Sequence, residues 1–227
     1  MAWFTHYFTS SIGRKLIMSL TGLFLILFLI VHLAGNFQLL ANDGGEAFNM
    51  YTYFMTHNPV IKTISYGLYF FILLHAVQGV ILWAKNRSAR SARYAVQHVQ
   101  ATWTSRNMFF LGLLIFAFLA IHMGDFWYKM KFTDQMEMVT YAGADHAVKD
   151  LFTRVDVAFS ELWIVIVYVI GMVALALHLA HGFASAFQTL GWNHMKYNRL
   201  IKTLGWIYTI VVPLGFAAIP VIMYLQS

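Results

Sequence analysis

Five stretches of the sequence are long and apolar enough to cross a lipid bilayer, and this feature limits the fold more than any other. A crossing helix needs about 20 mostly apolar residues, because it rises about 1.5 Å per residue through a core about 30 Å thick. The stretches are residues 14–40, 62–84, 106–129, 158–187 and 203–225. The apolar run Leu16 to Leu33 is too long for a signal peptide, so we expect the first stretch to be retained. The sequence predicts an all-α integral membrane protein: one bundle of five transmembrane helices over residues 1–227.

Composition supports a membrane location and removes several function classes. Of the 227 residues, 60% are hydrophobic and 11% are charged, whereas a soluble domain carries about a quarter charged residues. The chain contains no cysteine. This excludes disulfides, thiolate zinc sites, iron–sulfur clusters held by this chain and covalent c-type haem attachment.

The net charge of +6 reflects membrane topology, and we expect no nucleic-acid partner. The N-terminal tail and the segments 85–106 and 192–202 fall on one side of the predicted membrane, and all nine carboxylates fall on the other. The first side carries ten cations: Arg14, Lys15, Lys85, Arg87, Arg90, Arg93, Arg106, Lys196, Arg199 and Lys202. Cytoplasmic loops carry an excess of Lys and Arg. The N-terminus is therefore predicted to be cytoplasmic and the C-terminus to lie outside.

Histidines occur inside four of the five predicted spans. An ionisable residue within a transmembrane helix is a functional candidate, because leaving it in lipid is costly. His32 lies in the first span, His75 in the second, His122 in the third, and His178 and His181 in the fourth. The alternative is a structural role, in which each ring hydrogen-bonds to a neighbouring helix or lines a polar path.

These histidines fall into two layers of depth. His32 and His122 lie roughly 24–27 Å from the cytoplasmic surface at the helical rise per residue. His75 and His178 lie roughly 14 Å from it, and depth alone does not choose between His178 and His181. Two imidazoles per layer, drawn from two different helices, match the axial ligands of an iron porphyrin, and ligation offsets the cost of burying the rings. We therefore predict two b-type haems. His32 and His122 are called the outer pair below, and His75 and His178 the inner pair.

Glycines near the inner pair would give a bound macrocycle room. Gly79 follows His75 by four residues and Gly182 follows His178 by four, so each shares a helix face with its histidine. A missing side chain lets a flat ring approach, but glycine in membrane helices also serves plain helix packing.

Four segments, in order and spacing, resemble the di-haem cytochrome b subunit (b558 type) of succinate dehydrogenases and fumarate reductases. They are Phe28–Leu33, Leu74–Val80, Ala120–His122 and His178–Phe183. The resemblance covers essentially the whole chain, including Glu46–Asn49. It differs at Val173–Leu177, which contains no carboxylate, whereas some relatives carry one there that is associated with proton movement.

The resemblance implies a multi-pass anchor in a bacterial inner membrane, bound on the cytoplasmic side to an iron–sulfur subunit and a flavoprotein subunit. Electrons would pass between their succinate or fumarate chemistry and a quinone, here menaquinone. The succinate or fumarate site would belong to the partner, not to this chain. The implied haem iron ligands are His75 with His178 for the inner haem, and His32 with His122 for the outer. This choice selects His178 over His181.

The sequence also offers candidates for a propionate contact, a quinone site and a docking surface. His181 is expected to contact a propionate of the inner haem, or else to bond a neighbouring helix. For the quinone site Glu46 is the first choice, because a carboxylate can shuttle protons; an ordinary solvated loop acid is the alternative. Other candidates there are Asn36, Gln38, Asp125 and Trp127. The basic run Lys85–Arg93 either docks the iron–sulfur subunit or only fixes topology.

Two other functions remain open. The first keeps the two haems but changes the partner to a hydrogenase, a formate dehydrogenase or another quinone-linked enzyme. The second is a haem-free transporter or scaffold. An ion-coupled transporter would place Asp or Glu at mid-membrane, whereas the acids here are predicted to lie outside.

Overall fold

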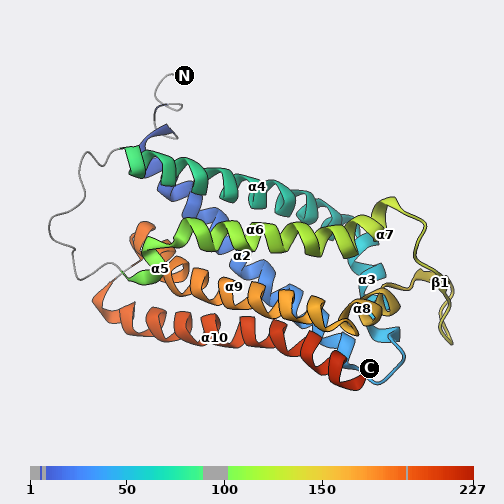
Figure 1. The fold of residues 1–227 in the computed structure, drawn as a ribbon. Helices are drawn as coiled ribbons and strands as arrows, with labels where there is room; N and C mark the ends of the chain where they lie inside the picture. Colours follow the sequence, from blue (N-terminus) through green and yellow to red (C-terminus); the bar gives the residue numbers. More distant parts are fainter. Residues whose placement is uncertain (1–5, 7–8, 89–101, 193) are drawn as a thin grey trace.

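The structure is a computed structural model that describes residues 6, 9–88, 102–192 and 194–227. Within this part of the chain, five helices are long and apolar enough to cross a membrane. They are formed around α2 (Ser11–Asn36), α4 (Pro59–Ser88), α6 (Met108–His122), α9 (Leu162–Thr189) and α10 (Met195–Gln226). They lie side by side as one bundle (Figure 1). The predicted all-α bundle is confirmed, and the chain is a multi-pass membrane protein; its orientation stays a prediction.

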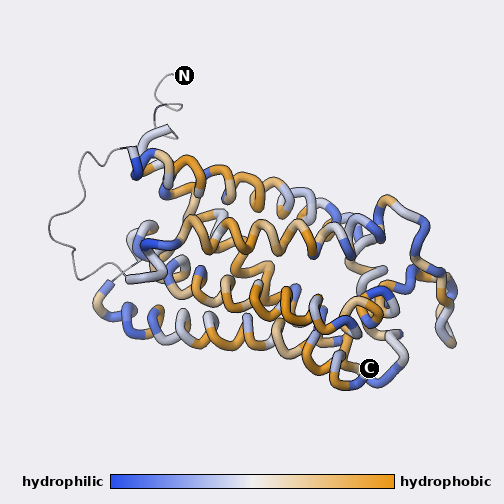
Figure 2. Tube along the Cα trace, in the orientation of Figure 1, coloured by the Kyte–Doolittle hydropathy of each residue, from blue (hydrophilic) through white to orange (hydrophobic). Residues whose placement is uncertain are grey.

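Apolar residues fill the middle of the bundle, and hydrophilic residues gather at its two ends (Figure 2). Polar residues begin the helices. The Ser10 side chain accepts a hydrogen bond from Gly13 N at the start of α2. Asn58 does the same for Val60 N before α4, whose first residue is Pro59. Such caps satisfy backbone N–H groups that have no partner within the helix.

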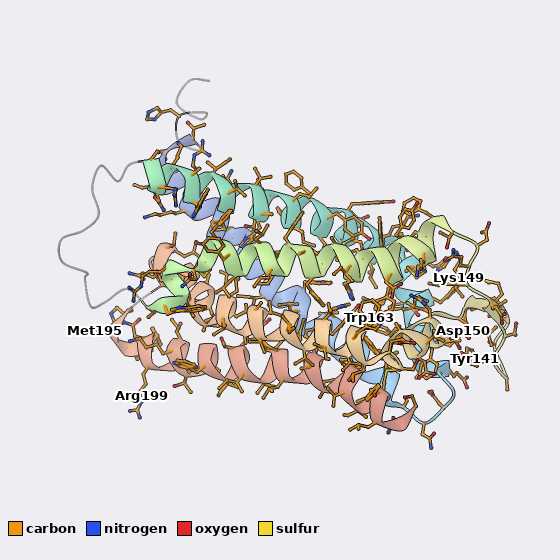
Figure 3. All side chains as sticks on the ribbon, viewed as in Figure 1. Tyr141, Lys149, Asp150, Trp163, Met195 and Arg199 are labelled. Atoms are coloured by element: carbon orange, nitrogen blue, oxygen red, sulfur yellow. The ribbon has the colours of Figure 1, made fainter. Side chains whose placement is uncertain are left out.

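One end of the bundle, called the capped end below, carries small elements that the sequence did not predict. They are the 3-10 turn η1 (Phe37–Leu40), α3 (Glu46–His57), α7 (Lys129–Phe132), α8 (Leu151–Phe159) and a hairpin of β1 (Met138–Val139) and β2 (Val148–Lys149). The labelled Tyr141, Lys149 and Asp150 gather there, whereas Met195 and Arg199 lie at the opposite, open end (Figure 3). The short α5 (Trp103–Arg106) also lies at the open end (Figure 1).

The fourth span begins later than predicted. Residues 158–161 were assigned to it, but Ala158 and Phe159 end α8, and α9 starts at Leu162. The chain turns at Glu161, whose backbone is extended. A charged residue at this turn stays outside the apolar segment. The fifth helix instead starts earlier, at Met195 rather than Thr203, because its first turns continue beyond the apolar residues.

Large buried side chains concentrate at the capped end. Leu33 and Leu39 pack there with Phe48 of α3, Phe126 after α6, and Phe159 of α8. Toward the open end α2 buries only small residues, Gly13, Ser19 and Thr21. None of the residues of α4, all of them described, is buried. The half of the bundle nearer the open end is thus less tightly filled than the capped half.

Candidate functional site

The outer pair brings together two helices near the capped end. His32 is close to the end of α2, and His122 is the last residue of α6. Their ring centroids are 5.8 Å apart, and the ring planes lie at 85°. Phe28 stacks on His32, and Phe118 stacks on His122. The two imidazoles therefore meet inside an aromatic shell.

The inner pair lies closer to the middle of the bundle. His75 of α4 and His178 of α9 have ring centroids 6.3 Å apart, with the planes at 64°. The structure thus brings the four predicted histidines together in the two combinations that the resemblance implied. Both pairs join helices that are separated in the sequence.

The separations suit two imidazoles that share one metal ion. With metal–nitrogen bonds of about 2 Å on opposite sides of the ion, the two ring centres lie about 6 Å apart. Within the described residues no group of three or more His, Cys, Asp or Glu is placed to hold a metal ion. A site that protein alone provides for zinc needs three or four ligands. Two histidines fit an ion whose other ligands come from a planar macrocycle.

Space beside the inner pair agrees with a flat group. Apart from its chain neighbours and the backbone of its own helix, no described atom lies within 4 Å of a Cβ placed on Gly182. At Gly79 the nearest described atom would be Met18 Cε, 3.6 Å away. His178 Nδ1 is buried and has no hydrogen-bond partner among the described residues. A buried polar group without a partner is costly, so its presence here calls for an explanation.

Hydroxyl groups on neighbouring helices hold two of the four rings. The Oη of Tyr168, a buried residue of α9, lies 3.2 Å from His122 Nδ1. Thr21 Oγ1 of α2 lies 3.1 Å from His75 Nδ1. Each contact engages Nδ1 of its ring, and where Nδ1 carries the proton, Nε2 is the nitrogen available to a ligand or metal. On α2, Asn36 Nδ2 donates to the His32 carbonyl at 2.7 Å and lies 3.3 Å from His32 Nδ1.

Sequence reasoning missed Thr21 and Tyr168, although a signal existed. Thr21 interrupts the apolar run Leu16–Leu33, and Tyr168 lies within the fourth span. Polar side chains inside membrane helices commonly bond across to a neighbouring helix. Their spacing from the histidines carries no information, since they lie 54 and 46 residues away in the sequence.

The remaining predicted site residues lie apart from the pairs or are engaged elsewhere. His181 is one turn beyond His178 toward the open end, and no described residue hydrogen-bonds to its side chain. Glu46 is exposed at the first position of α3, with no ion pair to a described residue. Trp127 Nε1 donates to Tyr69 Oη at 2.8 Å. No hydrogen bond within the described residues involves the Gln38 side chain.

Asp125 lies in an ion cluster beyond the outer pair. It belongs to η2 (Met123–Tyr128), a π-helical segment that follows His122 directly. Its carboxylate accepts from Lys129 Nζ at 2.6 Å and is paired with Arg154 of α8. π-helical turns are rare and are frequently found at functional sites. Here the turn lets one carboxylate pair with two cations between the bundle and the small elements of the capped end, which are together called the cap below.

Asn49 joins the pieces of the cap. Its side chain is 1% exposed. Nδ2 donates to Tyr141 Oη at 2.7 Å and to Asp150 Oδ1 at 2.9 Å, and Oδ1 accepts from Phe152 N at 2.9 Å. Partial burial raises the pKa of the Asp150 carboxyl, but hydrogen bonds from Thr153 and Asn49 outweigh it and hold that pKa below its ordinary value. Asn49 thus ties α3 to α8 and the hairpin.

Cations mark the open end, as the topology prediction requires. Lys85 and Arg87 end α4, Arg106 ends α5, and Lys196 and Arg199 lie in the first turns of α10. Of the predicted docking run Lys85–Arg93, residues 89–93 lie outside the described part of the chain.

Comparisons of the chain with known protein families, with curated proteins and with solved structures found no match.

Proposed function

We propose that this chain binds two b-type haems and is the membrane anchor of a succinate dehydrogenase or fumarate reductase. One observation carries the haem assignment. Two pairs of imidazoles meet inside a membrane bundle at two depths, with ring centroids 5.8 and 6.3 Å apart. The enzyme family rests on the four sequence segments around these histidines.

Each pair would hold one haem iron through its two Nε2 atoms. A bound b-type haem supplies one-electron transfer. The chain's own residues orient and shield the rings: Thr21 and Tyr168 engage Nδ1 atoms, and the aromatic shell keeps water from the outer pair. Two such sites at successive depths form an electron path between the open end and the capped end.

The partner and substrate follow from the proposed family. The iron–sulfur and flavoprotein subunits would dock at the open end, where the cations gather, and that end would face the cytoplasm. The quinone, menaquinone by the same resemblance, would react near the outer pair, with Glu46 as the proposed proton carrier. Glu46 suits this role because an exposed carboxylate at the capped end can exchange protons with water. His181 would contact a propionate of the inner haem.

A structural role for the histidines is the main competitor. The bonds to Thr21 and Tyr168 link helices, and ring pairs at 4.5–7 Å occur in ordinary aromatic packing. That reading gives no reason for the space beside Gly182. A bound haem accounts for this space.

Haem counting tests the proposal. We expect the purified full chain to contain two b haems in a pyridine haemochrome assay. His75→Ala and His178→Ala should each remove one haem and leave the other, and His32→Ala and His122→Ala should remove the second. His194→Ala, at an exposed position before the first turn of α10, is the matched control and should retain both. A colourless wild-type preparation would overturn the proposal and favour a transporter or scaffold.

Co-purification tests the family. A partner with covalent flavin and succinate-dependent haem reduction would support the proposed enzyme. A hydrogenase or formate dehydrogenase in the same complex would keep the haem sites and overturn the assignment of the partner.

A further inference from the structure

The hydroxyl of Thr21 touches the inner pair from a helix that contributes no ligand to it. Thr21 is 3% exposed, and its Oγ1 lies 3.1 Å from Nδ1 of His75 across the α2–α4 interface. We propose that Thr21 is a positioning residue: it fixes which nitrogen of His75 carries the proton, and through that bond it lowers the reduction potential of the inner haem. This inference rests on the proposed function.

The direction of the hydrogen bond follows from counting protons. A threonine hydroxyl has one proton and two lone pairs. The proton is used within α2, where Oγ1 donates to Ile17 O at 2.8 Å and approaches Met18 O at 3.1 Å. Toward His75 only the lone pairs remain. Nδ1 of His75 must therefore be the donor, and Nε2 is left with a free lone pair, the state that ligation of iron requires.

The neighbouring residue of α2 fits the same ring. A Cβ placed on Gly22 would lie 3.4 Å from His75 Cε1 and 3.9 Å from its Nδ1. A side chain longer than a methyl group at position 22 would press on the imidazole. Thr21 and Gly22 together form the surface of α2 against which the ring packs, with a polar contact at Nδ1 and a flat backbone surface at Cε1. This surface is called the seat of His75. The orientation of the ring is thus set from α2 as well as from its own helix.

The opposite ring of the inner pair lacks such a seat. His178 Nδ1 has no hydrogen-bond partner among the described residues, and a Cβ on Gly112 would only approach its Cε1 at 3.9 Å. A hydrogen bond from the outer ring nitrogen makes an imidazole a more basic ligand. More electron donation favours ferric over ferrous iron. His75 is therefore the stronger donor of the inner pair, and Thr21 is the cause.

Thr21→Val tests this, because valine keeps the shape of threonine and removes the oxygen. Loss of a second partner of a metal-bound histidine changes metal affinity about 10- to 100-fold. At the lower limit, a tenfold shift in the preference for ferric iron is about 59 mV for one electron. We expect the midpoint potential of the inner haem in the purified chain to rise, by about this amount where the bond acts on the ferric state alone, with a changed low-spin ferric EPR signal. Thr21→Ser, which restores the hydroxyl, should return both to wild-type values.

Controls distinguish the role of Thr21 from haem binding itself. The outer haem serves as an internal reference and should keep its potential. Thr21→Ala gives the same readout if valine reduces the yield. Two haems with an unchanged inner potential in both variants would overturn the role of Thr21 alone. Equal shifts in both haems, or no rescue by serine, would also overturn it. A wild-type chain without haem would instead overturn the proposed function.

Discussion

Removal of the Asn49 side chain should open the cap. Asn49→Ala deletes three hydrogen bonds at once and leaves the N–H of Phe152 and the hydroxyl of Tyr141 without their partner. It also removes a donor to the Asp150 carboxylate. Because the side chain is almost completely buried, water cannot easily replace these bonds.

The expected loss can be estimated from the partners. A neutral hydrogen bond contributes about 1 kcal/mol net, and one to a charged group about 1.5–3 kcal/mol. Asp150 is partly solvated, so the lower end of that range applies to its bond. The free energy of unfolding should fall by about 3 to 4 kcal/mol, which is large for a single substitution.

Reversible unfolding in detergent, with SDS as denaturant and circular dichroism as readout, measures this loss. Asn198→Ala is the matched control, because none of the described hydrogen bonds involves the Asn198 side chain and the residue lies at the open end. It should change stability by less than about 0.5 kcal/mol. If Asn49→Ala were no more destabilising than this control, the cap would not be held by Asn49.

Two further predictions concern the same end of the molecule. The pKa of Asp150 is lower in the folded protein than in the unfolded chain, so its contribution should persist at neutral pH and be lost as the pH falls below about 4; hydrogen exchange at the Phe152 amide should rise there, and Asp150→Asn should abolish this acid limb. Gly35→Ala would place a Cβ 2.9 Å from Tyr51 Cζ and should cost about 1–3 kcal/mol in the same SDS assay. Gly67→Ala, whose Cβ would meet no described atom within 4 Å, should not destabilise; equal effects of the two would contradict the proposed contact.

The bundle was predictable because each span is a local signal. About 20 apolar residues in succession predict a crossing helix whatever the rest of the chain does. The rise per residue then gave the depth of His32 and His75 without any tertiary information. The structure pairs each with the histidine expected from the same layer.

The cap was not predictable for the opposite reason. Asn49 finds Tyr141, Asp150 and Phe152 at sequence separations of 92, 101 and 103 residues, and no periodic pattern reports such a contact. The last two residues of α8 were assigned to the fourth span because Ala158 and Phe159 are apolar. The seat of His75 was missed in the same way, since Thr21 acquires its meaning only when α2 meets α4.

Because packing is uneven along the bundle axis, the capped half of the molecule resists local opening more than the half at the open end. Local opening costs least where few apolar contacts are buried. In the capped half, Leu33 and Phe126 belong to one cluster of packed, buried side chains. In the open half no residue of α4 is buried, and a Cβ on Gly182 would meet no neighbouring side chain within 4 Å. A rigid planar group inserted there would act as a spacer, so its removal should loosen the open half while the capped half stays closed.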